Sequence, residues 1–148
     1  MFNGVLLFLH LAGVIVWVGG MFFAALCLHP SLAALAGKDR AVLMSGTLRR
    51  FLRYVIVAVV LIWASGLSML AAAGVSPMPI GWHLMIGIGL VMTLIFAYLY
   101  LALFRPASQA IERGEMALVP ALFGRIRTLV MVNLTLGALA VAAVTILG

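Results

Sequence analysis

Four long apolar segments without any Asp, Glu, Lys or Arg constrain the fold of this chain more than any other feature. The segments are Phe2–Leu28, Tyr54–Ala73, Gly81–Phe104 and Thr128–Gly148. Each reaches the roughly 20 residues that a helix needs to cross a bilayer. Because lipid offers no water to unpaired backbone groups, such segments fold as helices. The sequence therefore predicts an all-α integral membrane four-helix bundle, a single transmembrane domain over residues 1–148.

Composition supports the membrane class and excludes others. The chain is 67% hydrophobic and only 8% charged, whereas soluble domains carry about 25% charged residues. The first segment lacks the basic start and small-residue cleavage pattern of a signal peptide, so we expect it to remain as a helix. Aromatic and basic residues do not interleave as a nucleic-acid surface requires, so nucleic acid is not an expected partner.

The distribution of charge predicts the orientation in the membrane. All nine Lys and Arg residues lie in the connections 29–53 and 105–127, and the connection 74–80 has none. Short loops rich in Lys and Arg stay cytoplasmic. We therefore expect both termini outside, in a bacterial inner (plasma) membrane. The three acids lie in the same basic connections, which excludes an intramembrane carboxylate relay.

Two histidines carry the main functional hypothesis. His10, Gly13, Trp17 and Gly20 fall within roughly 80° on a helical wheel, and His10 lies about 10 Å along its helix. His83 begins the third segment, and Gly87 follows one turn later. The first and third segments run parallel, so the two imidazoles are expected at similar depth near the outer face.

A pair of histidines on facing helices is typical of haem b ligation. We expect His10 and His83 to be the axial ligands. The glycines Gly13, Gly20 and Gly87 would make room for the macrocycle, and Trp17 would pack against it. Glycine faces also serve ordinary helix packing in membranes.

Copper is the alternative cofactor. His10 and His83, together with Met78 or Met85, could bind Cu(I), since soft thioether ligands favour that ion. Methionine is also a common filler of apolar helices. A third hypothesis is a non-catalytic subunit whose small-residue faces bind another membrane protein. Gly87 and Gly89 could also support a homodimer.

The first segment resembles the opening helix of the copper-resistance protein D family. The resemblance rests on His10, six further residues, and then Trp17-Val-Gly19-Gly20. The same opening is similar to that of the haem-binding membrane protoporphyrinogen oxidases. Further similarities to both families are Arg53-Tyr54 followed by Gly66, Gly81-Trp82-His83, and Arg125-x-Arg127 followed by Asn133 and Gly137.

Two positions depart from these families. Met85 stands where the oxidase group has a lysine, and Asn133 stands where the copper group often has a glutamate. The resemblance implies His10 as the first ligand and His83 as the second. The expected function is electron transfer, or oxidation of a membrane-soluble reductant, by a haem b protein.

Overall fold

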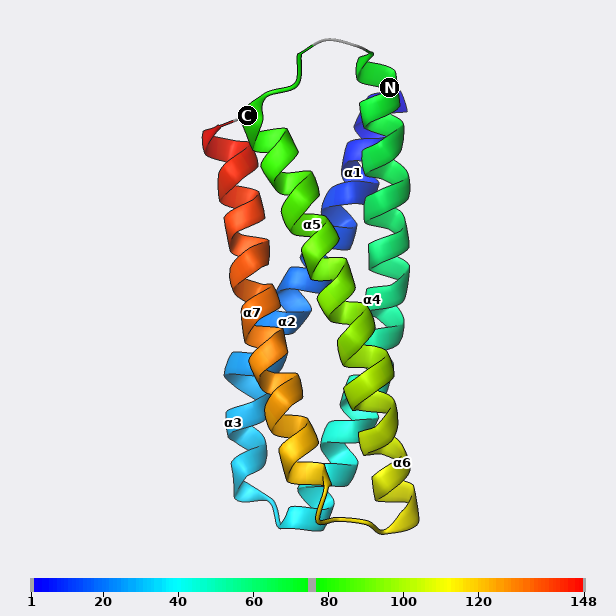
Figure 1. The fold of residues 1–148 in the computed structure, drawn as a ribbon, viewed down its shortest axis with the longest axis vertical. Coiled ribbons are helices and arrows are strands. Elements are labelled where there is room, and N and C mark those ends of the chain that lie inside the picture. Colours follow the sequence, from blue (N-terminus) through cyan, green and yellow to red (C-terminus); the bar gives the residue numbers. More distant parts are fainter. Residues whose placement is uncertain (1, 75–76, 148) are drawn as a thin grey trace.

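The computed structural model describes residues 2–74 and 77–147, and every regular element in this part of the chain is helical. Four helices are long and apolar enough to span a membrane (Figure 1). The predicted all-α architecture with four long apolar helices is thereby confirmed. We call these four helices spans 1 to 4. Met1 and Gly148 of the predicted domain, and Val75 and Ser76 of the second connection, lie outside the described residues.

The first span is a continuous helical rod with two π-helical stretches. Its elements in chain order are α1 (Phe2–Val14), η1 (Ile15–Gly19), α2 (Gly20–Phe22), η2 (Phe23–Leu28), α3 (His29–Ser31) and η3 (Leu32–Ala34). The π-helical stretches are η1 and η2. Wider turns of this kind change which side chains face a neighbouring helix.

All four spans are longer than the roughly 20 residues that one bilayer crossing requires. Span 2 is α4 (Gly37–Ala73). Span 3 joins α5 (Ile80–Tyr98), the π-helical η4 (Leu99–Phe104) and α6 (Arg105–Arg113). Span 4 is α7 (Val119–Ile146).

All four helices extend beyond the predicted limits at their basic ends, so most of residues 29–53 and 105–127 is helical rather than loop. A charged residue is excluded from the hydrocarbon core of a bilayer. A helix can nevertheless continue through charged residues once it has left the bilayer for water. The ends are set instead by local signals, such as Gly114 with φ +75° after α6 and a proline in the first turn of α7. Arg49 of α4 also stabilises these extensions, because it donates hydrogen bonds to Ser108 and, at 2.9 Å, to Glu112 of α6.

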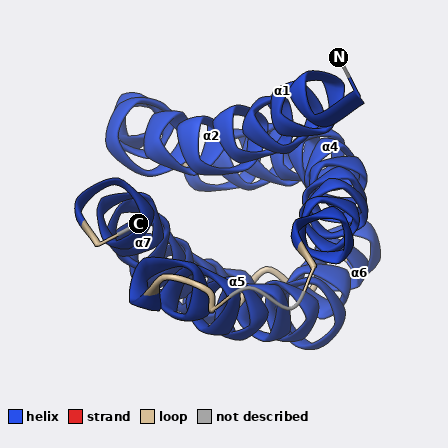
Figure 2. Ribbon diagram, turned by 90° about the horizontal axis from the view of Figure 1, so that it is seen from above, coloured by secondary structure: helices blue, strands red, loops and turns tan. Residues whose placement is uncertain are grey.

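Around the bundle the helices follow the order α1, α4, α5, α7. Seen from above, they are arranged in the shape of a C (Figure 2). Both chain ends and the α4–α5 connection lie together at the terminal end, while α3 and α6 lie at the opposite, basic end (Figure 1). In the half near the termini α1 packs on α4 and α5 packs on α7. Nearer the basic end, η1, α2 and η2 of span 1 also contact α7.

The tightly packed core lies in the middle of the bundle and toward the basic end. Its members include Trp17, Leu52, Leu99 and Ile126. Among the described residues, α1 has no buried side chain before Gly13, and α7 has none after Gly137. Side-chain packing therefore leaves the half near the termini more open than the rest.

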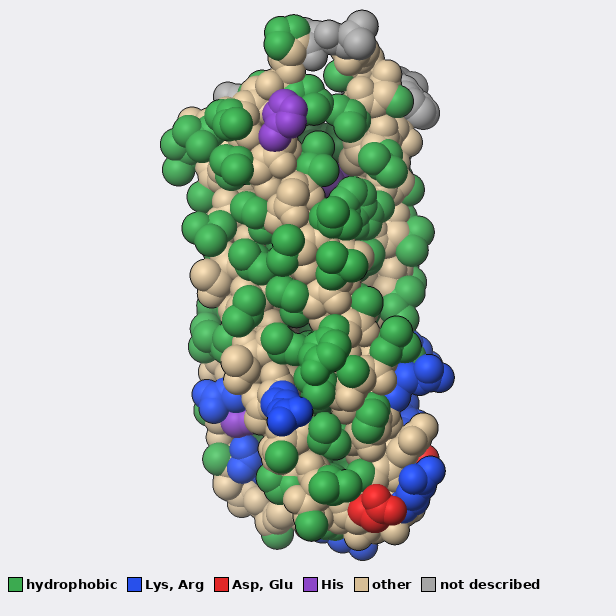
Figure 3. All heavy atoms as spheres, viewed as in Figure 1, with side chains coloured by type: hydrophobic (Ala, Val, Ile, Leu, Met, Phe, Trp, Pro, Cys, Tyr) green, Lys and Arg blue, Asp and Glu red, His purple; other side chains and the backbone are tan. Residues whose placement is uncertain are grey.

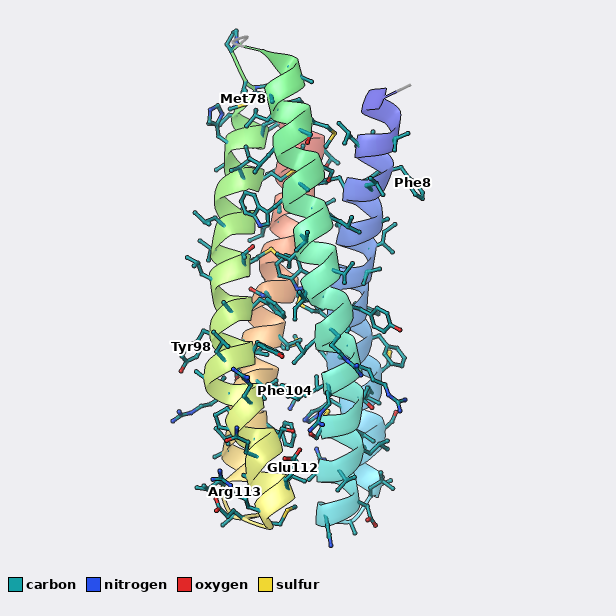
Figure 4. All side chains as sticks on the ribbon, turned by 90° about the vertical axis from the view of Figure 1, so that its right-hand side faces the viewer. Phe8, Met78, Tyr98, Phe104, Glu112 and Arg113 are labelled. Carbon is teal, nitrogen blue, oxygen red and sulfur yellow. The ribbon has the colours of Figure 1, made fainter. Side chains whose placement is uncertain are left out.

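Charged and hydrophobic side chains occupy different parts of the surface along the long axis of the molecule (Figure 3). Lys and Arg side chains gather toward the basic end, whereas hydrophobic side chains cover most of the remaining face. Phe8 and Tyr98 point away from the bundle (Figure 4), and their exposed fractions are 68% and 53%. This outward apolar surface is compatible with a multi-pass membrane protein.

Candidate functional site

His10 lies half-buried on α1 with its imidazole against the backbone of α4. Its Nδ1 is 3.1 Å from the carbonyl oxygen of Ile62. A carbonyl oxygen can only accept a hydrogen bond, so Nδ1 carries the proton in this arrangement. In the neutral ring Nε2 then keeps its lone pair. This is the tautomer in which a histidine ligates a metal through Nε2 while a backbone carbonyl orients the ring.

Two further residues of α4 complete the surroundings of the ring, and we call Ile62, Ser65 and Gly66 the His10 cradle. The hydroxyl of Ser65 donates to the carbonyl of Leu61, and its oxygen lies 3.3 Å from Nδ1 of His10. A Cβ atom added at Gly66 would lie 3.2 Å from Cε1 and 3.3 Å from Nδ1 of His10. A side chain at position 66 would therefore be in tight contact with the imidazole, which would have to shift by a few tenths of an ångström.

In the sequence, Gly66 stands out only through the family resemblance, and Ser65 only as one of the polar residues within the apolar segments, for which an interhelical hydrogen bond is the expected role. A signal was present, since Ser65-Gly66 is a polar and small pair within an apolar helix. Which helix it faces depends on tertiary packing.

His83 lies in the first turn of α5 and is exposed. Its Nδ1 is 3.2 Å from the carbonyl oxygen of Pro79, so the same reasoning leaves its Nε2 with a free lone pair. His10 and His83 lie on helices that start from the terminal end, as expected. However, they belong to different helix pairs, α1 with α4 and α5 with α7. Among the described residues no hydrogen bond joins them directly.

The glycines expected to make room for a cofactor have different surroundings. A Cβ at Gly13 would lie 2.7 Å from Cγ1 of Ile62 and 2.9 Å from the carbonyl oxygen of Ala58. The space at Gly20 is filled by the ring of Phe51. The space expected for a cofactor beside Gly13 and Gly20 is thus occupied by residues of α4. Both glycines serve helix packing. Gly87 has no neighbouring atom within 4 Å of its Cβ position.

Trp17 is buried in the core and meets another aromatic ring rather than an open site. Its ring packs edge-to-face on Phe96 of α5, with centroids 6.1 Å apart and planes at 73°. Tyr100 and Phe104 continue this row toward the basic end, at centroid spacings of 6.3 and 6.1 Å. Phe104 lies inside the bundle rather than on its surface (Figure 4). Trp17 therefore joins spans 1 and 3.

Asn133 of α7 is another buried polar group, only 2% exposed. Its Nδ2 donates to the carbonyl oxygen of Met92 at 3.1 Å, whereas its Oδ1 is buried without a hydrogen-bond partner. A second interhelical bond runs from Trp63 Nε1 to Thr93 Oγ1 at 3.0 Å. Such bonds hold membrane helices in register.

His10 and His83 are donors of the kind that haem iron takes, which is one or two neutral imidazoles, and they come from two different helix pairs. Within residues 2–74 and 77–147, no three His, Cys, Asp or Glu side chains form a group that could hold a metal ion. The methionines of the copper alternative, Met78 and Met85, are both half-buried, and Met78 lies near the terminal end (Figure 4).

Comparisons of the chain with protein-family models, curated proteins and solved structures gave no match.

Proposed function

We propose that this chain is a haem b-binding protein of the bacterial inner membrane, with His10 and His83 as axial ligands through Nε2. The observation that carries the proposal is the pairing of each Nδ1 with a backbone carbonyl, Ile62 for His10 and Pro79 for His83. Both rings thereby keep a free nitrogen lone pair near the same end of the bundle. Haem b, when bound, would supply reversible one-electron chemistry, suited to electron transfer or to oxidation of a membrane-soluble reductant.

The surroundings of His10 support a role beyond packing. A polar side chain within a membrane span is a functional candidate by default, and here α4 supplies a carbonyl, a hydroxyl and a glycine to one edge of the ring. The half of the bundle near the termini has few buried side chains, so a flat ligand there would disturb little core packing. Gly87 of α5 is exposed and has no neighbouring atom within 4 Å of its Cβ position.

Family membership and orientation belong to the same proposal. The pattern from His10 to Gly20 supports kinship with the copper-resistance protein D and membrane protoporphyrinogen oxidase families. The basic end would lie in the cytoplasm and the histidine end outside, as the distribution of Lys and Arg favours.

The test is an absorption spectrum of the detergent-purified protein, air-oxidised and then dithionite-reduced, with metal analysis of the same sample. A Soret band with sharp α and β bands after reduction is expected, because two imidazoles give low-spin six-coordinate iron. A Soret band without sharp α and β bands would mean a single ligand and would overturn the assignment of His83. Absence of haem after haem-sufficient expression, with bound copper, would favour Cu(I) binding instead.

Histidine variants assign the ligands. We expect His10→Ala and His83→Ala each to lower the haem content or to remove the sharp α and β bands of the reduced spectrum. His29→Ala is the matched control, since His29 is the third histidine and lies in α3 at the basic end. Full haem content and an unchanged spectrum in both test variants would contradict the ligand assignment.

A further inference from the structure

A groove runs along α7 on the surface of the bundle near the basic end. It has a volume of about 630 Å³, and its wall on span 1 includes Leu26 of η2. On α7 it begins at Gly124 and Arg127 and ends at Leu136, with Met131 and Val132 between them. We call this surface the α7 groove. In Figure 2 α7 lies at one end of the C of helices, next to the open side.

Only one charged side chain lines the α7 groove, and the rest of its lining is effectively apolar. The hydroxyls of Thr128 and Thr135 already donate to carbonyl oxygens of their own helix, those of Gly124 and Met131. Leu26, Met131 and Val132 are exposed. The groove therefore combines a cation at one end with an apolar channel.

The cation has no acidic partner in the described part of the chain. The one ion pair found there joins Arg49 to Glu112. Arg127 also borders a small cavity of about 30 Å³ that His29 lines from span 1, and Arg40 adds positive charge beside His29. This side of the basic end thus carries an excess of positive charge that an anion would neutralise.

The length of the groove matches one leaflet of a membrane. Arg127 and Leu136 are nine residues apart, which corresponds to about 14 Å along a helix. Half of the hydrocarbon core is about 15 Å thick. An acyl chain in the groove would therefore end near the bilayer centre when its headgroup is level with Arg127.

We propose that the α7 groove is a binding site for one anionic phospholipid, with its phosphate at Arg127 and one acyl chain along Met131, Val132 and Leu136. Charge complementarity favours this occupant over a second copy of the chain. A second copy carries nine Lys and Arg residues but only three acidic residues. It would therefore add positive charge at Arg127 and would not neutralise it.

The experiment is native mass spectrometry of the delipidated full-length protein with an equal mixture of phosphatidylglycerol and phosphatidylcholine of identical acyl chains. One Arg near an anionic headgroup contributes about 1 kcal/mol, so we expect about a fivefold preference for phosphatidylglycerol. Arg127→Gln should abolish the preference. Arg125→Gln is the matched control, because Arg125 is an exposed arginine on the same helix that does not line the groove.

A second variant tests the apolar part of the site. Val132→Trp places a large side chain in the channel, and Val132 is 41% exposed, so the core remains intact. We expect loss of the first bound lipid. An equal loss of preference in Arg127→Gln and Arg125→Gln would overturn the proposal, because it would mean diffuse surface attraction. Equal binding of the two lipids would also overturn it, and so would a dimer that excludes lipid.

Discussion

At the scale of single residues, the backbone of α4 determines how His10 can act. The carbonyl of Ile62 fixes the proton on Nδ1, and the missing side chain of Gly66 lets the ring approach α4 closely. The imidazole is thereby held in one orientation without a charged partner, which suits a site within the membrane. Loss of a group that orients a ligating histidine typically lowers metal affinity 10- to 100-fold.

Gly66→Ala should therefore weaken haem binding by about tenfold, at the low end of that range. The added methyl group would lie 3.2 Å from Cε1 and 3.3 Å from Nδ1 of His10, so the ring would have to shift from the position in which Nδ1 meets the carbonyl of Ile62. Haem titration of the apoprotein, followed at the Soret band, measures this change. Gly46→Ala is the control, since Gly46 lies on the same helix as Gly66 and nothing lies within 4 Å of its Cβ position. Unchanged haem affinity in Gly66→Ala would show that the cradle does not position the ligand.

At the scale of elements, glycines decide how closely span 1 and α4 pack. Gly13 meets Ile62 and the backbone of Ala58, and Gly20 meets the ring of Phe51. Side-chain clearance at the helix interface is the ordinary role of glycine in membrane bundles. By contrast, Gly19 of the same span has no neighbour within 4 Å of its Cβ position.

Gly13→Ala should lower the free energy of unfolding by about 1–3 kcal/mol, the usual cost of overpacking. The carbonyl of Ala58 belongs to the helix backbone and cannot move aside as a flexible side chain would. Gly19→Ala is the matched control and should be neutral or stabilising by up to about 1 kcal/mol, because alanine restricts the unfolded chain. Unfolding in detergent, followed by circular dichroism, compares the two. Equal stability of both variants would contradict the close approach at Gly13.

At the scale of the whole molecule, the two ends of the bundle differ in charge and in the chain segments that they contain. The termini and the α4–α5 connection share one end, and the basic residues gather toward the other (Figures 1 and 3). An even number of long helices brings both chain ends to the same end of a bundle, and the four long apolar helices meet this condition. The excess of Lys and Arg at one end favours retention of that end in the cytoplasm.

Single-cysteine labelling tests this orientation. In a Cys27→Ser background, Pro77→Cys should react with a membrane-impermeant maleimide in intact cells, whereas Ala117→Cys should react only after permeabilisation. Both positions are exposed and lie in connections between spans. The reverse pattern would show that the basic end faces outward.

The sequence by itself determined the class, the number of spans and the separation of charge. These properties depend on runs of about 20 apolar residues and on the positions of charged side chains, both of which are local. Helix ends were predicted less well, since the charged residues that mark the edge of the bilayer continue the helices beyond it. Gly114 and Pro120 mark some of the true ends.

Only the tertiary structure decided which helix each polar or small residue faces. A helical wheel placed Gly13, Trp17 and Gly20 on one face with His10, but it could not show that α4 occupies the glycines or that Phe96 meets Trp17. The cradle of Ile62, Ser65 and Gly66 around His10 was also beyond sequence reasoning. The contacts of His10 and Trp17 join residues more than fifty positions apart. Their pairing depends on how whole helices pack rather than on any local pattern.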